Sequence, residues 1–149
     1  MHLGYHNNPK ANAEAFTADG WFRTGDLGRI VDGDGNVAIV GRRKEIINRG
    51  GKKFFPREVE EILYTHPKIM HAAMVGIADA RLGERNCLCV IPKSGQAVTL
   101  DEMVAFLKGQ VADYKLPEVL VEVDELPMTA TGKLRRHVLS EQIAERRAR

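Results

Sequence analysis

The pattern of apolar residues changes near residue 44, and this change restricts the possible folds more than any other feature of the chain. Before it, apolar residues gather mainly in GRIVDGDGNVAIVGR, residues 28–42, where two short runs flank aspartates and glycines that tolerate a tight turn. We expect a β-hairpin there. After residue 44 the sequence has the pattern of a compact mixed domain, and 149 residues suffice for one ordinary core or a small core with an appendage.

Three segments of the second part have helical periodicity. Pro56 suits the first turn of the first segment, whose apolar face is formed by Val59, Ile62 and Leu63. In the second segment Thr99 and Glu102 have the spacing of a capping box, and in the third Leu134, Val138, Leu139 and Ile143 recur at helical spacing. The helices are expected within 54–67, 98–109 and 134–149, and strands within 71–78, 86–92 and 117–127. The predicted fold class is α+β: a small three-stranded sheet packed with helices and preceded by a β-hairpin.

Charge and residue usage exclude several function classes. The 22 basic and 20 acidic side chains leave a net charge of +2, too small to indicate a nucleic-acid or anionic-membrane partner. No apolar run reaches the roughly 18 residues that a membrane span needs, and the first residues lack a secretory signal, so we expect a soluble, cytoplasmic protein. The only cysteines, Cys87 and Cys89, are expected to be buried thiols on one strand face.

No metal held by the chain is expected. The histidines are scattered and have no metalloprotease spacing. The stretch DGDGN, from residue 32, suggests a calcium loop, but Val37 stands where the sharp turn needs glycine and Arg43 where a bidentate glutamate belongs.

Four stretches carry a family resemblance. They are GWFRTGDLG (20–28), GRRKEIINRGGKKFFPREVEEIL (41–63), DYKLP (113–117) and PMTATGKLRR (127–136). Together, and in this order, they resemble the adenylate-forming acyl-CoA synthetases, which are relatives of firefly luciferase and of peptide-synthetase adenylation domains. The second stretch looks like the family's hinge motif with its glycine loop, and the fourth is similar to its terminal lysine motif.

The resemblance implies a domain organisation. Residues 1–43 would be the tail of the large amino-terminal adenylation domain, and residues 44–149 the mobile carboxyl-terminal domain. Nothing in the sequence matches the Ser/Thr/Gly-rich phosphate loop of the large domain. We therefore expect a carboxyl-terminal fragment, inactive alone, whose partner is its own missing amino-terminal domain.

The resemblance also implies the reaction. Such an enzyme is an AMP-forming acid–thiol ligase, which activates a carboxylic acid with ATP as acyl-AMP and then transfers the acyl group to coenzyme A after a rotation of the small domain. The implied cofactors are ATP/AMP, coenzyme A and Mg²⁺, the metal travelling with the phosphates of ATP and not being held by this chain.

Particular residues match the family's functional positions. Lys133 corresponds to the catalytic lysine of adenylation, where an ammonium group offsets the repulsion between carboxylate and triphosphate. Asp26 would accept hydrogen bonds from the ribose hydroxyls of adenosine, with Arg42 close to the same ribose and phosphate. Lys44 matches the hinge position.

The glycine loop at 48–51 would line the pantetheine tunnel. Gly50 and Gly51 would allow close approach of backbone to the thiol arm, and Arg49 is a candidate for the phosphates of the coenzyme. A solvated basic loop is an equal interpretation of Arg49.

Two other function classes stay open at this stage. The chain could be a stand-alone binding or regulatory module without catalytic activity, or its basic carboxyl-terminal helix could bind nucleic acid or anionic lipid. The sequence does not identify the acid, and it favours coenzyme A over a carrier-protein thiol only weakly.

Overall fold

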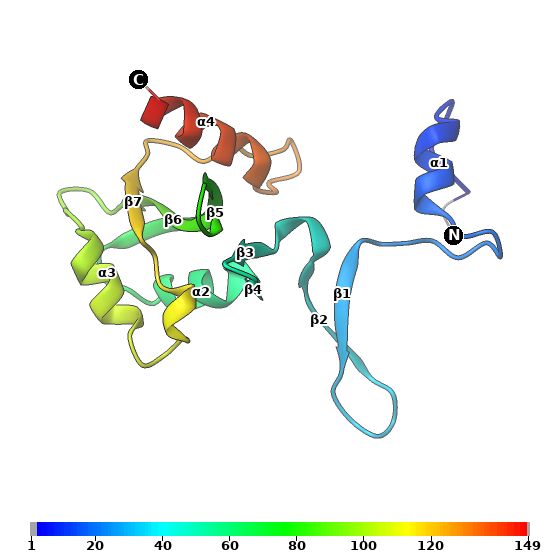
Figure 1. The fold of residues 1–149 in the computed structure, drawn as a ribbon, viewed down its shortest axis with the longest axis horizontal. Coiled ribbons are helices and arrows are strands. Elements are labelled where there is room, and N and C mark those ends of the chain that lie inside the picture. The colour runs from blue at the N-terminus through cyan, green and yellow to red at the C-terminus, as the bar shows by residue number, and fades with distance from the viewer. Residues whose placement is uncertain (1–2, 149) are drawn as a thin grey trace. The chain divides into compact units, whose positions relative to one another are not determined.

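The structure, a computed structural model, describes residues 3–148 (Figure 1). The chain divides into two compact units, with the boundary between Lys44 and Glu45. Among the described residues, no helix combines the length and the apolar composition needed to cross a membrane.

The first unit consists of a short helix and a hairpin. Helix α1 (Pro9–Ala15) begins after Asn8, whose side chain accepts a hydrogen bond from the backbone N–H of Ala11. Strands β1 (Asp26–Ile30) and β2 (Val37–Arg42) pair antiparallel, as the sequence predicts. The carboxylate of Asp32 stabilises the connecting turn, because it accepts hydrogen bonds from the N–H groups of Asp34 and Asn36.

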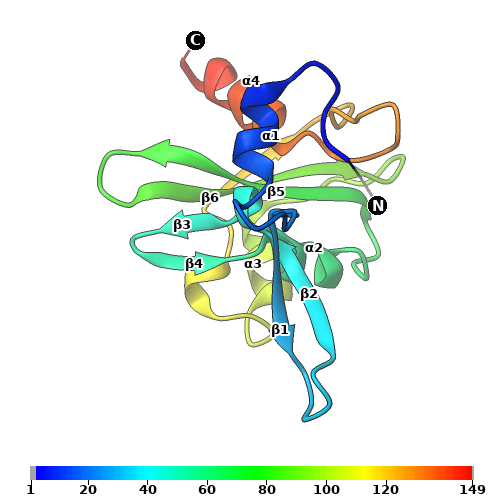
Figure 2. The ribbon, with the colours of Figure 1, turned by 90° about the vertical axis from the view of Figure 1, so that its right-hand side faces the viewer.

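The second unit is built around a mixed sheet. Its two long strands, β5 (Ile69–Asp79) and β6 (Gly83–Pro92), pair antiparallel, and the short strand β7 (Val119–Glu122) lies parallel to β6. A small hairpin of β3 (Ile47–Arg49) and β4 (Lys52–Phe54) joins the sheet at the start of β6 (Figure 2). Helices α2 (Pro56–Leu63), α3 (Leu100–Leu107) and α4 (Arg136–Ala148) pack on this sheet, and 3₁₀ turns occupy Arg43–Glu45 and Asp113–Lys115.

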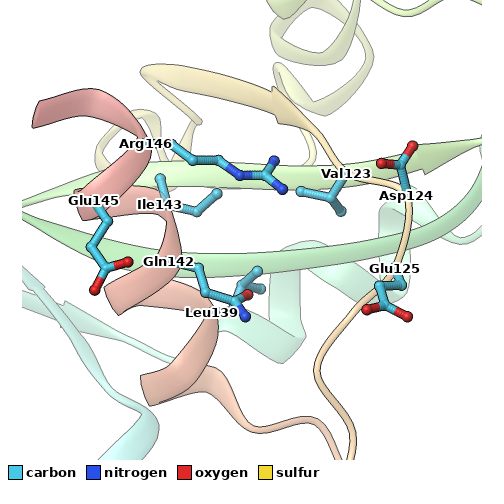
Figure 3. A pocket seen from close by; sticks show the side chains of 8 residues that line it. All are labelled: Val123, Asp124, Glu125, Leu139, Gln142, Ile143, Glu145 and Arg146. Carbon is cyan, nitrogen blue, oxygen red and sulfur yellow. The ribbon is translucent and has the colours of Figure 1, made fainter. Parts of the chain in front are cut away.

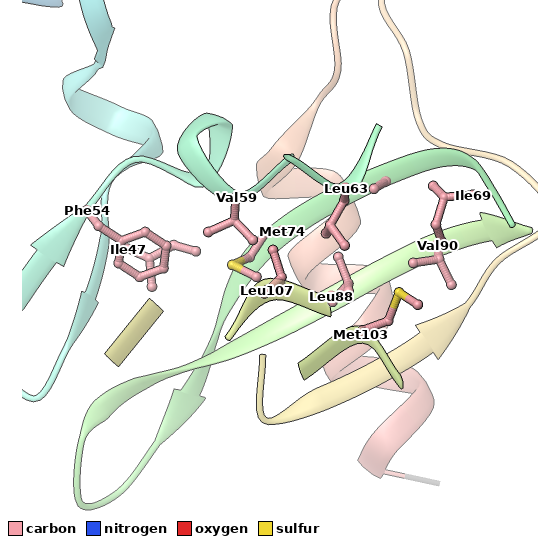
Figure 4. Close-up of a cluster of buried hydrophobic side chains, with 11 residues drawn as sticks. Ile47, Phe54, Val59, Leu63, Ile69, Met74, Leu88, Val90, Met103 and Leu107 are labelled. Atoms are coloured by element: carbon pink, nitrogen blue, oxygen red, sulfur yellow. The ribbon is translucent and has the colours of Figure 1, made fainter. Parts of the chain in front are cut away.

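Side chains alternate between two apolar clusters on the opposite faces of the sheet. Met74 and Leu88 point into the cluster shown in Figure 4, where they meet side chains from α2 and α3. Their neighbours Val75, Cys87 and Cys89 face the other cluster, which includes residues of α4. Both thiols are buried, as expected. The alternation explains how one short sheet supports helices on both faces.

The predicted fold class is confirmed, and the sheet is larger than expected. The three predicted strands are present, the third shortened to β7, while the β3–β4 hairpin adds two strands that the sequence analysis did not assign. Helix α1 is a further unassigned element. The capping box is only half formed: Thr99 Oγ1 accepts from Glu102 N at 3.2 Å, but the Glu102 carboxylate binds Lys68 instead.

Candidate functional site

The loop that carries Lys133 is closed by its own hydrogen bonds. Thr129 Oγ1 accepts from Lys133 N at 3.0 Å, and Thr129 N donates to the Lys133 carbonyl at 2.8 Å. Gly132, at φ 75°, gives the turn that these bonds require. Leu134 and Met128 form an isolated bridge at the base of the loop. The exposed Lys133 therefore extends from a compact, hydrogen-bonded loop three positions before the first residue of α4.

The structure places Asp26 and Arg42 opposite each other in the hairpin of the first unit. They are register partners across β1 and β2, and Arg42 Nε lies 3.2 Å from Asp26 Oδ1. The Thr24 hydroxyl accepts from Asp26 N at 3.1 Å, which fixes the backbone before the strand. A carboxylate accepts several hydrogen bonds at once, so pairing with Arg42 leaves Asp26 acceptor sites for hydroxyl donors.

Gly50 and Gly51 form the two-residue turn between β3 and β4. Their φ angles of 58° and 84° are both positive, as a type I′ turn requires. Gly50 N donates to the Leu82 carbonyl at 2.8 Å, and a Cβ at Gly50 would lie 3.2 Å from Leu82 Cδ2. The turn is therefore held against the β5–β6 connection.

Arg49, immediately before this turn, is already paired. Its guanidinium donates to both carboxylate oxygens of Glu118, at 2.7 and 3.0 Å. The hydrogen bond from Arg49 lowers the pKa of Glu118, and the same bond raises the pKa of Arg49. Asn86, fully buried, extends the network because its amide donates to the carbonyls of Tyr114 and Leu116. This network joins the glycine turn to the DYKLP stretch.

Lys44 is exposed and stands at the boundary of the two units. The next residue, Glu45, accepts a hydrogen bond from Arg136 at 3.3 Å. Arg136 also binds Glu60. Burial opposes the positive charge of Arg136, but the hydrogen bonds and negative charges of Glu60 and Glu45 outweigh burial and raise the pKa of Arg136. The sequence analysis assigned no role to these three residues, because nothing in their spacing shows that residues 76 and 91 positions apart meet.

The candidate residues thus form separate groups. Asp26 and Arg42 meet in the first unit, Arg49, Gly50 and Gly51 share one turn of the second, and Lys133 makes its hydrogen bonds within its own loop.

A cavity of about 390 Å³ lies in the second unit between α4 and the end of β7, and none of the candidate residues lines it. Figure 3 shows its apolar side chains, Val123, Leu139 and Ile143, with charged side chains around them. Lys133 is not among the residues that line it. We therefore assign the candidate site by its residues and not by this cavity.

The comparison with known families decides the identity. The AMP-binding enzyme C-terminal domain matches residues 58–133, about half of the chain. This chain belongs to the adenylate-forming acyl-CoA synthetase superfamily. The recognition made from the sequence motifs is therefore confirmed, and the matched residues represent the carboxyl-terminal domain of these enzymes.

Several curated relatives of this superfamily match nearly the whole chain. The oxalate–CoA ligase of Saccharomyces cerevisiae is 45% identical over 96% of the chain, and the mitochondrial medium-chain acyl-CoA ligase ACSF2 of Macaca fascicularis is 40% identical over 95%. These alignments cover 26% and 23% of the relatives, so the chain spans about a quarter of their length.

Solved adenylate-forming enzymes share the fold. ATP-bound MatB from Rhodopseudomonas palustris is 33% identical and aligns with a TM-score of 0.85 over 96% of this chain and 28% of its own. The MenE o-succinylbenzoate CoA synthetase of Bacillus subtilis, in complex with its acyl-adenylate, aligns with a TM-score of 0.82 over 92% of this chain and 28% of its own.

Two of the candidate residues offer polar groups of opposite charge to a ligand. Among residues 3–148, no group of three His, Cys, Asp or Glu side chains could hold a metal ion. Asp26 offers oxygen acceptors for hydroxyl donors, and Lys133 offers an exposed cation for phosphate or carboxylate oxygens.

Proposed function

We propose that this chain is the carboxyl-terminal portion of an acyl-CoA synthetase that activates a carboxylic acid as acyl-AMP with ATP and transfers it to coenzyme A. The observation that carries the proposal is an exposed lysine, Lys133, on a closed loop within the family's carboxyl-terminal domain. A lysine in this setting contributes charge and not packing, which suits a reaction between two anions.

Lys133 acts in the first half-reaction. A carboxylate oxygen attacks the α-phosphorus of ATP, a P–O bond forms, and the bond to pyrophosphate breaks. Both reactants are anionic, so the Lys133 ammonium lowers the barrier by binding oxygens on which negative charge concentrates. The backbone bonds to Thr129 hold the loop in shape, so that only the side chain of Lys133 has to be ordered in the reaction.

Asp26 and Arg42 belong to adenosine binding. The Asp26 carboxylate would accept hydrogen bonds from the ribose hydroxyls, and Arg42 would contribute positive charge near the ribose and phosphate. The ion pair between them supports this assignment, because it orients the carboxylate from the neighbouring strand. Mg²⁺ would accompany the phosphates of ATP.

The second half-reaction uses the glycine turn. The sulfur of coenzyme A attacks the acyl carbonyl carbon, the thiol proton is lost, and the C–O bond to AMP breaks. Gly50 and Gly51 lack side chains at a tight turn, which suits close passage of a narrow thiol arm. Arg49 remains a candidate for the phosphates of the coenzyme, although binding one would require it to share or leave Glu118.

Lys44 is the proposed pivot between the two half-reactions. A rotation about its backbone would move Lys133 away and bring the glycine turn to the acyl-AMP, and a few residues at an element end suffice for such a hinge. The position of Lys44 at the boundary of two compact units supports this role.

The proposed partner is a large amino-terminal domain with the acyl pocket. The hairpin of the first unit supports it, because Ile30, Val37 and Ile39 are 70%, 58% and 62% exposed. Apolar side chains gathered on one hairpin indicate a surface that another part of a protein covers. The acid itself is determined by that domain; the relatives named above act on different acids.

The test is a comparison of the two half-reactions in the full-length protein. Lys133→Ala should lower acyl-AMP formation on the order of a hundredfold or more, because the anions lose one electrostatic partner. Thioester formation from supplied acyl-AMP and coenzyme A should survive. Pyrophosphate release and thioester production measure the two steps. An equal loss of rate in acyl-AMP formation and in thioester formation would show that Lys133 is not specific to adenylation.

A further inference from the structure

Arg136 is the first residue of α4, three positions after Lys133, and it connects parts of the second unit that are far apart in sequence. Its side chain is only 17% exposed. The guanidinium donates to the carboxylates of Glu60 and Glu45 and to the carbonyl of Met74. A partly buried arginine with this many acceptors is held in one orientation.

The contact of Arg136 with Glu60 is the more buried of its two ion pairs. The Glu60 side chain is 8% exposed, and its Oε2 accepts from Arg136 Nη2 at 2.8 Å. Its Oε1 accepts from Met74 N at 2.7 Å, while the Met74 carbonyl accepts from Arg136 Nη1 at 3.1 Å. The pair thereby satisfies both backbone groups of Met74 at the outer edge of β5. Loss of Glu60 would leave a buried charge without its main partner.

The contact of Arg136 with Glu45 is more exposed than its contact with Glu60. Glu45 is 36% exposed and accepts from Arg136 Nε at 3.3 Å. Without it, Arg136 would keep both oxygens of Glu60 and the Met74 carbonyl, so the fold does not depend on Glu45. The contact joins the residue after Lys44 to the base of the Lys133 loop.

We propose that Arg136 and Glu45 are positioning residues for adenylation, which fix the Lys133 loop relative to the segment that follows the pivot. This inference rests on the proposed function. The first half-reaction needs the Lys133 ammonium at one place, and a displacement of about 1 Å can cost a hundredfold in rate. The second half-reaction does not use Lys133, so a looser connection leaves it intact.

The test removes one carboxylate from each of two arginine–glutamate ion pairs in the full-length protein, one partly buried and one exposed. Glu45→Gln should slow acyl-AMP formation about tenfold or more, a misplacement effect, while thioester formation from supplied acyl-AMP changes less than about twofold. The matched control is Glu61→Gln, which breaks the exposed pair with Arg57 on α2 and should alter neither step. Arg136→Lys keeps the positive charge but loses the planar guanidinium group with its several donors. Like Glu45→Gln, it should slow acyl-AMP formation more than thioester formation.

A second measurement separates this inference from the proposed function. In NMR spectra of this 149-residue chain, Glu45→Gln should shift the Arg136 Nε signal and the amide signals of the Lys133 loop, and Glu61→Gln should not. If these signals shift but the variant retains wild-type rates or loses both steps equally, the positioning role is wrong. If the wild-type full-length protein forms no acyl-AMP from any acid, the proposed function is wrong, and so is the positioning role of Arg136 and Glu45.

Discussion

Glu118 shows how one carboxylate can organise the glycine turn without belonging to it. It binds Arg49 through both oxygens and also accepts from the backbone N–H of Asn86 at 3.4 Å. Arg85 lies 3.7 Å from the same carboxylate. An anion shared by two arginines and a backbone donor is stabilised in its charged form.

The second unit should therefore lose stability in acid, and Glu118 should account for part of the loss. Its pKa is lowered in the folded state, so its contribution is complete above the unfolded-state value of 4.5 and disappears as pH falls through the folded value. The Glu118→Gln variant should have a lower free energy of unfolding than the wild type near neutral pH, and the difference between the two should shrink at low pH. Urea unfolding followed by circular dichroism from pH 7 downward measures this. Parallel curves at all pH values would contradict the assignment.

Sequence motifs located the charged residues of the candidate site but not the residues that hold the surrounding structure in place. Lys133, Asp26 and the glycines lie in motifs whose order and spacing are visible along the chain. Glu118 meets Arg49 across 69 positions, and Glu60 meets Arg136 across 76. Such pairs depend on how the sheet folds, and periodicity within a single element carries no information about them.

In the described part of the chain, the outer edge of β5 is covered by side chains and not by a neighbouring strand. Edge strands expose unpaired backbone groups, and here side chains cover them. The Tyr64 hydroxyl donates to the Ala72 carbonyl, Glu60 and Arg136 bind Met74, and the Ser140 hydroxyl donates to the Gly76 carbonyl at 2.7 Å. Helices α2 and α4 thus meet the same strand edge through polar groups, in addition to their apolar faces.

Glu60→Gln should be strongly destabilising. The amide cannot neutralise Arg136, and breaking a buried pair on one side costs about 3–5 kcal/mol. Chemical unfolding of the wild type and of the variant gives the difference in free energy. Glu61→Gln, one position along the same helix but 60% exposed, should stay within about 0.5 kcal/mol of the wild type. A loss below about 1 kcal/mol for Glu60→Gln would mean that the edge is held by other contacts.

Two elements absent from the sequence analysis had visible local signals. Asn8 followed by Pro9 is the start signal of a helix, and α1 begins there, but seven residues give too little periodicity to reveal it. The two glycines of NRGGKK permit a two-residue hairpin turn, and the strands beside it are only three residues long. The longer elements were predictable because each buries a full apolar face. The third strand was predicted too long, since pairing with β6 stops at Glu122.

The two units differ in how much of their apolar surface they bury. The second has a cluster on each sheet face, whereas the hairpin of the first leaves most of its large apolar side chains exposed. A hairpin alone is marginally stable in water, so the first unit is expected to depend on the proposed large domain. Under this interpretation, the boundary after Lys44 separates a segment that belongs with that domain from a domain that moves against it.

A proline at this boundary tests the proposed rotation in the full-length protein. Lys44→Pro fixes φ near −65° and removes a backbone donor, so it restricts the backbone angles available to the pivot. Adenylation, which occurs before the rotation, should persist, and acyl-AMP should accumulate while thioester production falls on the order of a hundredfold, because the second active conformation is no longer reached. Lys44→Ala, which removes the side chain but keeps the backbone free, should retain both steps. Quenched-flow measurement of acyl-AMP and thioester in the same samples separates the outcomes. If Lys44→Pro lowers both half-reactions equally, or if Lys44→Ala reproduces its effect, Lys44 does not act through its backbone and the pivot lies elsewhere.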